Sequence, residues 1–458
     1  MRPRRSNTGL SGPIPRTFAA LVALALAISS CGNSTSKGGA RTETTASEST
    51  DRSTTAAGGS DENVPNASPG VSDTEIRVGG VASITNPLGG KYADAFEGVK
   101  AYFDMVNAEG GVFGRQLVVA AERDDKLANN KSEVEGLLSQ DNVFAALPMA
   151  SLLFTGADTL VEQGVPTFGW TVNPEWEGTK AAPRSNLFGQ TGSFLCFGCD
   201  GTTVPWIAQE IEATKIGVLA YSVSQSAQCA DGVRASFTKY GKVVGAEVAF
   251  FDASLTYGTA DLSVQVEKMK AAGVDLVTTC MDTNGIVTLA KEMKKQQLDA
   301  VQYVPNGYDH DFLDEFGDLF EGSYVRTDFV QWEVKDRPKG LADFLTWMDK
   351  RGVEPSENSV SAWINAATFV AGLRAAGPTF TRQKVIDAVN VMSDFDADGL
   401  IHGVDWTIGH TTRESETENC QFLSKIEAGE FVPAFSEPGK PFVCGVFEGG
   451  KITTRNDA

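Results

Sequence analysis

Residues 75–121 read EIRVGGVASITNPLGGKYADAFEGVKAYFDMVNAEGGVFGRQLVVAA, and this stretch decides the fold. It begins and ends with short apolar runs, residues 75–83 and 116–121, which are typical of buried strands. Between these runs, four apolar side chains recur at helical spacing on one face: Tyr92, Phe96, Val99 and Phe103. A strand, an amphipathic helix and a second strand in this order predict a right-handed βαβ unit with parallel strands.

The same alternation continues along the chain. Further strands are predicted at residues 143–147, 165–169, 215–221, 246–251, 274–280 and 300–304. Helices are predicted at residues 126–140, 152–163, 227–240, 261–272 and 285–295. A break at residues 189–203 separates two such series, and the chain exceeds the ~250–300 residues at which a single core stops growing. We therefore expect an α/β fold with two doubly wound, Rossmann-like lobes.

The last part of the chain has a different pattern. Long helices are predicted at residues 340–350 and 358–376, and Gly377 with Pro378 ends the second of them. From Leu400 onward the sequence is typical of strands and hairpins. We expect these late elements to return to both lobes and to complete both sheets.

The first thirty residues have the pattern of an export signal. Four arginines precede the apolar run at residues 18–28, and no acidic residue occurs before Cys31. The ending Ile28-Ser29-Ser30-Cys31 resembles the bacterial lipobox. We therefore expect residues 1–30 to be removed and Cys31 to be lipidated, which places the protein outside the cytoplasm, anchored to the bacterial cell membrane through lipid.

Residues 31–72 are mostly small or polar. Such a segment buries too little apolar surface to offset its ordering entropy, so we expect a disordered tether, with the folded part beginning near Thr74. No later stretch approaches the ~18–20 consecutive apolar residues needed to span a bilayer.

The charge of the chain excludes nucleic acid as a partner. There are 39 Lys and Arg residues against 59 Asp and Glu, a formal charge of −20. Removal of residues 1–30 takes away four positive charges and no negative ones, so −20 becomes −24. So acidic a surface repels phosphate backbones and favours a soluble protein, which we expect to be a monomer.

Several passages resemble one known family. Residues 96–115, from FEGVKA to NAEGGVFGR, resemble the opening of the type 1 periplasmic binding proteins, and more narrowly the branched-chain amino-acid-binding receptors of ABC importers. Further similar passages follow in the same order: ALPMAS at 146–151, GVP at 164–166, ADLSVQV at 260–266, AGVD at 272–275 and PNG at 305–307. The resemblance spans about residues 72–435.

The resemblance implies two α/β lobes joined by three crossover strands, with a ligand trapped in the cleft by hinge closure. The N-terminal lobe would comprise residues 73–192 and 326–400, and the C-terminal lobe residues 193–325 and 401–458. In open α/β sheets, ligands bind at the carboxyl ends of the strands. We therefore expect the binding residues in the loops that follow the strands.

Eight residues in those loops are the predicted ligand-binding set: Tyr92, Ser151, Trp170, Thr171, Ser226, Asp282, Asn306 and Tyr308. By resemblance, Ser151 and the Trp170-Thr171 pair hold a ligand carboxylate, and Ser226 and Asp282 cover the ligand from the second lobe. Asn306 stands where amino-acid-binding members place an acid for the ammonium group.

The predicted set departs from the family at two positions. Asn306 cannot neutralise a cation as a carboxylate does, although Asp282 could substitute for it. Trp170 is larger than the small residue expected, and together with Tyr92 and Tyr308 it favours an aromatic, amide-like or larger apolar solute. Alternatively, Trp170 and Tyr308 only pack the rims of the lobes.

The seven cysteines suggest three disulfides if Cys31 carries lipid. In the lobes that the resemblance implies, we propose the pairs Cys196–Cys199, Cys229–Cys280 and Cys420–Cys444. Cys196 and Cys199 have the C-x-x-C spacing of thiol oxidoreductases. Because they lie at the predicted crossover between the lobes, a structural disulfide is the favoured interpretation.

Other chemistry has little support. Residues 394–405 contain much of an EF-hand calcium loop, but the twelfth position is Asp405 and no exiting helix follows. There are three histidines, no H-E-x-x-H motif and no G-x-S-x-G elbow. The sequence therefore predicts no catalytic residues, no metal and no cofactor.

The resulting prediction is a lipid-anchored receptor. It would deliver a small polar solute (an amino acid, an amide or a related compound) to the membrane permease of an ABC importer by closing its cleft, and it would not be an enzyme. The alternatives are an envelope thiol–disulfide protein that uses Cys196 and Cys199, or a ligand sensor without transport.

Overall fold

The computed structural model describes residues 62–179, 181–192, 198–408, 410 and 418–457. All of these residues belong to one compact unit that spans residues 57–458. The predicted signal, Cys31, most of the predicted tether and Cys196 lie outside the described residues. In the part of the chain that is described, none of the helices combines the length and hydropathy that a membrane span requires.

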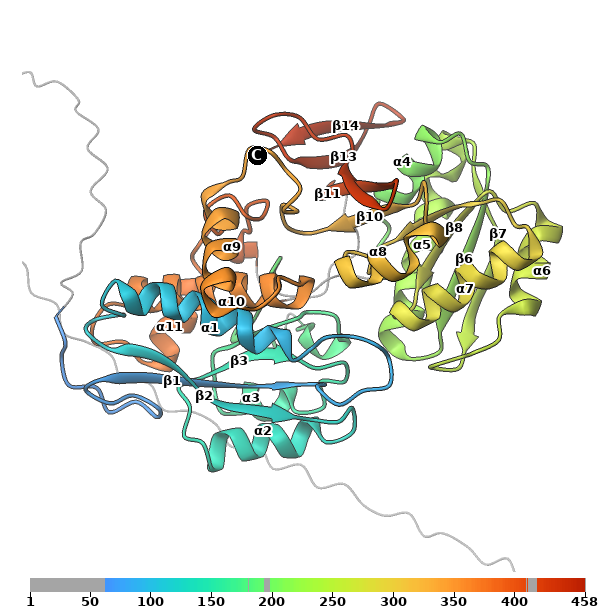
Figure 1. The fold of residues 1–458 in the computed structure, drawn as a ribbon. Coiled ribbons are helices and arrows are strands. Elements are labelled where there is room, and N and C mark those ends of the chain that lie inside the picture. Colours follow the sequence, from blue (N-terminus) through green and yellow to red (C-terminus); the bar gives the residue numbers. More distant parts are fainter. Residues whose placement is uncertain (1–61, 180, 193–197, 409, 411–417, 458) are drawn as a thin grey trace, which may run out of the picture. The chain divides into compact units, whose positions relative to one another are not determined.

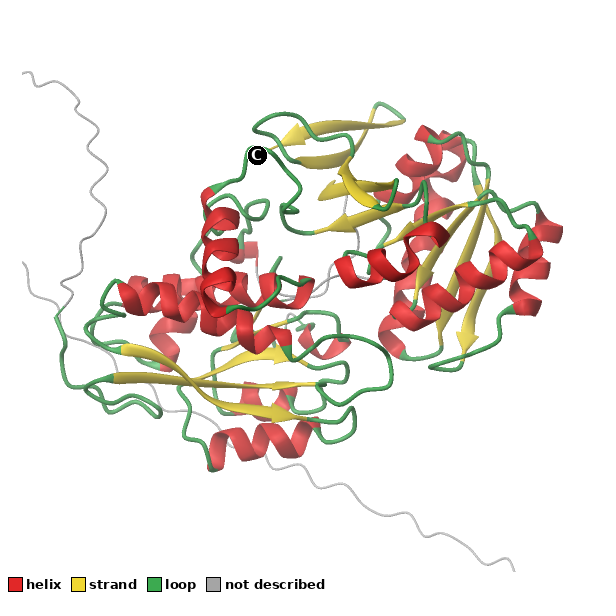
Figure 2. Ribbon diagram, viewed as in Figure 1, coloured by secondary structure: helices red, strands yellow, loops and turns green. Residues whose placement is uncertain are grey.

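The chain forms two α/β lobes, each built around its own sheet (Figure 1). Helices flank the strands of both sheets (Figure 2). The predicted fold class is confirmed, including the parallel sheets and the two Rossmann-like lobes. The exact boundaries of the lobes along the chain stay a prediction.

The first lobe contains a five-stranded parallel sheet in the order β2-β1-β3-β4-β5. Its strands are β1 (Glu75–Ala82), β2 (Gln116–Asp124), β3 (Ala145–Ala150), β4 (Thr167–Gly169) and β5 (Leu187–Gly189). The helices between them are α1 (Asp94–Ala108), α2 (Asn130–Ser139) and α3 (Ala157–Glu162), with the 3-10 turn η1 (Pro174–Trp176). All four side chains of the predicted apolar face are buried, so the alternation identified this unit correctly.

The second lobe contains a nine-stranded mixed sheet in the order β14-β13-β11-β10-β9-β8-β6-β7, with β12 paired to β11. Its parallel strands are β6 (Lys215–Tyr221), β7 (Glu247–Leu255), β8 (Leu276–Cys280), β9 (Val301–Val304) and β10 (Tyr324–Thr327). Its helices are α4 (Thr203–Glu210), α5 (Ser224–Val244), α6 (Ser263–Ala272), α7 (Thr283–Gln296) and α8 (His310–Phe316), followed by η2 (Gly317–Leu319).

The C-terminal strands complete one sheet, not both. They are β11 (Glu418–Glu427), β12 (Glu430–Pro433), β13 (Phe442–Glu448) and β14 (Lys451–Asp457). β11 pairs antiparallel to β10, and the other three strands extend the second sheet from there. The expectation that strands would return to both sheets was therefore wrong, because the free edge of β10 receives the whole tail.

The late segment that returns to the first lobe is helical. It consists of α9 (Lys339–Arg351), α10 (Glu357–Ala376) and α11 (Arg382–Val389), and the turn η3 (Trp406–Ile408) follows. α10 packs against α1, β3 and β4, and most of its side chains are buried. At the crossing with α1, a Cβ atom on Gly98 would come within 1.9 Å of the Ser359 carbonyl oxygen, so only glycine permits this approach.

The chain passes between the two sheets three times. The passages follow β5, β10 and the helices that end with α11. An isolated antiparallel bridge between Phe329 and Ile401 joins the second passage to the third. This arrangement agrees with the three crossovers that the resemblance implied.

Two local differences from the predicted elements have a clear physical cause. α2 begins at Asn130 and not at residue 126, because Lys126 and Leu127 have φ values of 48° and 67°, which no right-handed helix accommodates. The side chains of Asp124 and Asp125 accept hydrogen bonds from the amides of those two residues and hold the turn.

The packed part of the chain also begins earlier than expected. The guanidinium group of the fully buried Arg115 donates to the carbonyl oxygens of Val64 and Ser72 at 2.6 and 2.7 Å. Asn66 donates to the Phe380 carbonyl at 2.8 Å. A buried guanidinium needs acceptors for its N–H groups, so residues 64–72 serve the fold instead of extending the tether.

Two disulfides link neighbouring elements of the second lobe. Cys229–Cys280 joins α5 to the end of β8, and Cys420–Cys444 joins β11 to β13. These are two of the three pairs expected from the sequence. Cys199 is disulfide-bonded as well, and its partner lies outside the described residues.

Candidate functional site

A cavity of about 260 Å³ lies where loops of the two lobes meet. The first lobe contributes residues after β1, β3 and β4, and the second lobe contributes residues at or after the ends of β6, β7, β8 and β9. Its central lining is Tyr92, Leu152, Trp170, Tyr221, Ser226, Tyr257, Asp282 and Asn306. These are the carboxyl ends of parallel strands, where ligands bind in open α/β sheets.

The cavity continues from the cleft into the second lobe. It follows one face of α5 from Gln225 past the Cys229–Cys280 disulfide to Ser236. Eleven helical steps of 1.5 Å separate Gln225 from Ser236, which gives this branch a length of roughly 16 Å. The site therefore has room for a solute larger than its cleft portion alone would hold.

Five of the eight predicted ligand-binding residues line this cavity: Tyr92, Trp170, Ser226, Asp282 and Asn306. Ser151, Thr171 and Tyr308 are not among its lining residues. The Ser151 hydroxyl accepts from Asn130 at 2.9 Å and donates to the Val81 carbonyl at 3.3 Å. Thr171 is fully buried, and its hydroxyl has no hydrogen-bond partner in the described chain.

Tyr308 packs inside the second lobe's rim. Its ring lies 4.5 Å from Trp332 and 4.9 Å from Phe431, centroid to centroid. Its hydroxyl donates to Glu333 at 2.8 Å and accepts from the Trp332 amide at 3.1 Å. Because ring and hydroxyl are both satisfied by the protein, the rim-packing alternative describes Tyr308 better than a ligand contact does, and its ligand role stays a prediction.

Aromatic rings surround the cleft part of the cavity. The ring centroids of Tyr92 and Trp170 lie 5.6 Å apart, and those of Tyr221 and Tyr257 lie 4.9 Å apart in a T-shaped, edge-to-face arrangement. Tyr92 and Tyr221 are buried, while Trp170 and Tyr257 are half-buried. The sequence missed Tyr221 and Tyr257, because a tyrosine at the end of an apolar strand looks the same as a core residue.

Asp282 caps a helix with one carboxylate oxygen and also lines the cavity. As the N-cap of α7 it accepts from the Gly285 amide at 3.1 Å through Oδ1. Its Oδ2 is buried, and the pKa of the neighbouring Tyr221 is raised by burial and then by its side-chain hydrogen bond and charge interaction with Asp282. Next to it, the Ser226 hydroxyl accepts from the Tyr221 amide at 2.8 Å and donates to the Cys280 carbonyl, so Ser226 fixes the strand ends.

The remaining charges at the cleft are mutually paired. Arg326 forms a short ion pair with Asp328, and both residues line the cavity. A smaller adjoining cavity of about 40 Å³ adds Glu357, the first residue of α10. Burial raises the pKa of Glu357 to about 8, opposed by Arg326 and assisted by Asp328 and Asp309. The pair and Glu357 were not predicted, because they converge only through the second crossover.

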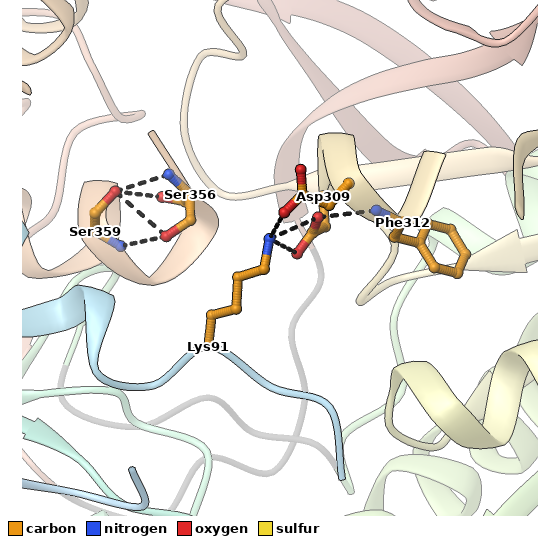
Figure 3. A network of polar contacts seen from close by, with 6 residues as sticks. Lys91, Asp309, Phe312, Ser356 and Ser359 are labelled. Atoms are coloured by element: carbon orange, nitrogen blue, oxygen red, sulfur yellow. Dashed lines mark hydrogen bonds and ion pairs between the residues drawn. The ribbon is translucent and has the colours of Figure 1, made fainter. Parts of the chain in front are cut away.

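Four polar contacts connect the lobes at the mouth of the cleft. Lys91 reaches Asp309 at 3.3 Å and Asp311 at 2.5 Å (Figure 3). Asn284 donates to the Pro87 carbonyl at 3.2 Å, and Gln225 donates to the Leu152 carbonyl at 3.1 Å. Lys91, Pro87 and Leu152 belong to the first lobe, so these bonds form only when the two rims are close.

Figure 3 also shows how the helix starts beside the cleft are fixed. Asp309 caps α8 by accepting from the Phe312 amide at 3.0 Å. Ser356 and Ser359 form a reciprocal capping box at the start of α10. The Asp309 cap fixes the turn between β9 and α8, and the capping box fixes the turn between α9 and α10.

Acidic side chains of the EF-hand-like segment at residues 394–405 have partners within the protein. Asp396 accepts from the Asp398 amide, Asp398 pairs with Lys339, and Asp405 accepts from Thr407. In the described chain, one group of metal-ligating residue types converges: His402, Cys420 and Cys444. Its two cysteines form a disulfide, so they cannot act as thiolate ligands.

Comparisons with known proteins agree with this geometry. A family model described as periplasmic binding protein matches residues 75–430. A search of curated protein sequences finds no significant match.

Among solved structures, the branched-chain amino acid transporter substrate-binding protein LivJ from Streptococcus pneumoniae, in complex with isoleucine, superimposes with a TM-score of 0.64 at 17% identity, over 83% of this chain and 100% of that chain. A branched-chain amino acid ABC transporter protein from Thermus thermophilus with bound valine gives 0.64 at 18% identity, over 79% and 95%. A fatty acid ABC transporter substrate-binding protein from Thermomonospora curvata gives 0.64 at 19%, over 81% and 95%.

Glu357 predicts a pH dependence of stability. The unfolded chain loses this proton above about 4.5, whereas the folded protein keeps it up to about 8. Stability should therefore fall as the pH rises from 4.5 to 8. Glu357→Gln removes this loss. The difference in melting temperature between the variant and the wild type should therefore be about 2–4 °C more in the variant's favour at pH 9 than at pH 5.

Melting curves of both proteins at the two pH values measure this effect. Glu354→Gln removes a carboxylate from an exposed position just before α10 and serves as the matched control. The same gain in both variants, or none in Glu357→Gln, would show that Glu357 is not held protonated in the fold.

Proposed function

We propose that the chain, which belongs to the periplasmic binding protein family, is an extracytoplasmic receptor that binds a small polar solute in this cleft and delivers it to an ABC importer. The observation that carries the proposal is the cavity itself, whose lining comes from strand ends of both lobes. A solute that contacts both linings favours the closed arrangement over the open one, since only the closed arrangement offers both sets of contacts. The permease would then recognise the closed, loaded receptor.

The class of solute follows from this chain's own lining, because similar folds serve different cargoes. The Streptococcus pneumoniae relative holds isoleucine, the Thermus thermophilus relative holds valine, and the Thermomonospora curvata relative is named for fatty acids. Here the aromatic rings and Asp282 line the cleft, and Asn306 adds an amide. These groups suit an amino acid, an amide or a related polar compound with an apolar part.

A screen of solutes tests the proposal directly. The full chain is incubated with amino acids, amides, short peptides and aromatic acids, and the melting temperature is recorded. At least one solute should stabilise the fold in proportion to its occupancy, and calorimetry should show a single site. Trp170→Ala should lower the affinity for that solute by at least about tenfold, because the substitution removes a large aromatic face from the cavity.

Trp347→Ala on α9 is the matched control, since it makes the same truncation outside the cavity lining. It should leave the affinity unchanged. If no solute binds, or if both variants bind as well as the wild type, the proposed function or its site is wrong.

The ion pairs of Lys91 allow a test of how much closure of the cleft contributes to affinity for the solute. Lys91→Met removes the ion pairs that cross from the first lobe to Asp309 and Asp311 but leaves the cavity lining intact. Partly exposed pairs contribute little, so affinity for the solute should fall only about two- to fivefold, chiefly through faster release. Stopped-flow binding measures both rates.

Lys100→Met is the control for this change. Lys100 pairs with Glu97 and Glu122 within the first lobe, so its removal should leave the release rate alone. A release rate that rises equally in both variants would contradict a closing role for Lys91.

We also propose that the receptor is held at the membrane by lipid on Cys31. The support is the sequence pattern before Cys31, and the cysteine itself lies outside the described residues. Cys31→Ser should move the protein from the membrane fraction to the soluble fraction and abolish labelling by a fatty-acid analogue. Ser30→Ala, which keeps the cysteine and a small residue before it, should retain both. Equal membrane retention of the two variants would refute the anchor.

A further inference from the structure

Part of the cavity extends away from the cleft and is lined by elements of the second lobe. One face of α5 runs along it, with Gln225, Cys229, Gly232, Val233 and Ser236 at helical spacing. The rest of its lining comes from the segment that begins α4 and from the sheet: Gly201, Thr203, Val204, Thr278, Tyr303 and Gln421. We call this space the α5 branch.

The cavity as a whole is larger than an ordinary amino acid requires. Its volume is about 260 Å³, and a water-sized group needs about 10–15 Å³ of such space, so roughly 17–26 groups of that size fit. Isoleucine and valine have far fewer non-hydrogen atoms than this. The α5 branch, roughly 16 Å long, therefore has room for a part of the solute that the cleft does not hold.

The charged side chains of the lining outside the cleft loops are paired within the protein. Asp200 forms an ion pair with Lys239 at 2.6 Å and accepts from the Tyr240 hydroxyl at 3.0 Å. Arg326 is paired with Asp328. A charged group that entered the α5 branch would lose its water without gaining a counter-ion, which is costly. The branch therefore favours an uncharged part of the solute.

Polar side chains of the α5 branch also bond within the protein. The Ser236 hydroxyl accepts from the Gly201 amide at 2.8 Å and donates to the Gly232 carbonyl at 2.7 Å. The Tyr303 hydroxyl donates to the Gln421 side-chain oxygen at 3.4 Å. An ordered water needs about two to four polar partners, so a row of waters is a poorer occupant here than an apolar chain is.

Apolar groups and open space complete the α5 branch. Val204 and Val233 line it, and the Cys229–Cys280 disulfide adds two sulfur atoms, which are soft and polarisable. A Cβ atom added to Gly201 would meet no other atom within 4 Å, so this residue borders open space. Methylene groups placed against such a surface leave water, which is favourable.

We propose that the α5 branch is a subsite for an uncharged, unbranched alkyl or acyl chain, and that the solute of this receptor carries such a chain behind a polar head that stays in the cleft. This inference rests on the proposed function, because it names the class of solute for the same cavity. Since C–C bonds of about 1.5 Å form a zigzag, a chain of about eight to twelve carbons fills the roughly 16 Å of the branch.

Homologous compounds test this subsite while the natural solute is unidentified. The purified full chain is titrated calorimetrically with the butyl and octyl members of three series that differ in their head group: alkanoates, alkanamides and alkylammonium salts, each below its critical micelle concentration. One buried methylene group raises affinity by up to about fourfold. In at least one series the octyl member should therefore bind at least about tenfold more tightly than the butyl member.

Two substitutions that fill the α5 branch locate the preference for the octyl member. Val233→Trp places an indole ring in the branch, and Gly201→Leu adds a side chain where the structure has open space. Each should reduce the octyl-to-butyl affinity ratio at least about tenfold, because the chain loses its place. Val243→Trp is the matched control, since Val243 lies on the same helix, is 38% exposed and is outside the cavity lining. It should keep the ratio of the wild type.

The outcomes separate this inference from the function on which it rests. An octyl preference that both filling substitutions abolish and Val243→Trp retains supports the subsite, and Gly201→Leu decides if Val233→Trp does not fold. The inference is overturned, while the receptor function stands, if butyl and octyl members bind equally, if the preference survives both substitutions, or if only solutes without a chain bind. If no compound of this series or of the wider screen binds, both fail.

Discussion

The direction of the strands is the constraint on which the site depends. Within each parallel block every strand points the same way, so the carboxyl ends of β1, β3 and β4 meet at one edge of the first sheet, and those of β6, β8 and β9 meet at one edge of the second. Each end is followed by a turn and a helix. The cavity therefore arises from topology, and no compact sequence motif is needed to build it.

In two of these turns, one aspartate side chain has two roles. Asp282 after β8 and Asp309 after β9 both cap the next helix with a carboxylate oxygen. Asp309 also forms an ion pair with Lys91 of the other lobe, and Asp282 also lines the cavity. Asp309 therefore both caps a helix and contacts the other lobe.

Much of this arrangement was predictable from the sequence. The alternation of apolar runs located β6 with its observed bounds, and Gly273 ends α6 with the left-handed φ of 70° that a C-terminal glycine favours. Five of the eight residues expected at the ligand line the cavity, and the resemblance together with the strand ends had placed them there; their contact with a ligand stays a prediction. The two strands β5 and β10 were missed. Each is the last strand before the chain passes to the other lobe, so no amphipathic helix and further strand of the same sheet follow it to mark it.

What the sequence could not show depends on distant contacts. Arg326 and Asp328 come to the cavity because a crossover carries them there, and Ser151 is turned away from it by Asn130 and Val81. Arg115 is fully buried and held by carbonyl oxygens of the preceding segment, contacts that no local sequence pattern indicates. A single sequence contains no pattern for partners that are tens of residues away.

The bonds made by Arg115 decide which lobe any upstream attachment would hold. Val64, Asn66 and Ser72 are fixed to Arg115 and Phe380, and Arg115 lies directly before β2 of the first lobe. The chain that leads back toward Cys31 therefore leaves from that lobe alone. If the lobes close on a solute as proposed, an attachment at the N-terminus would hold the first lobe only and would leave the second lobe free to move.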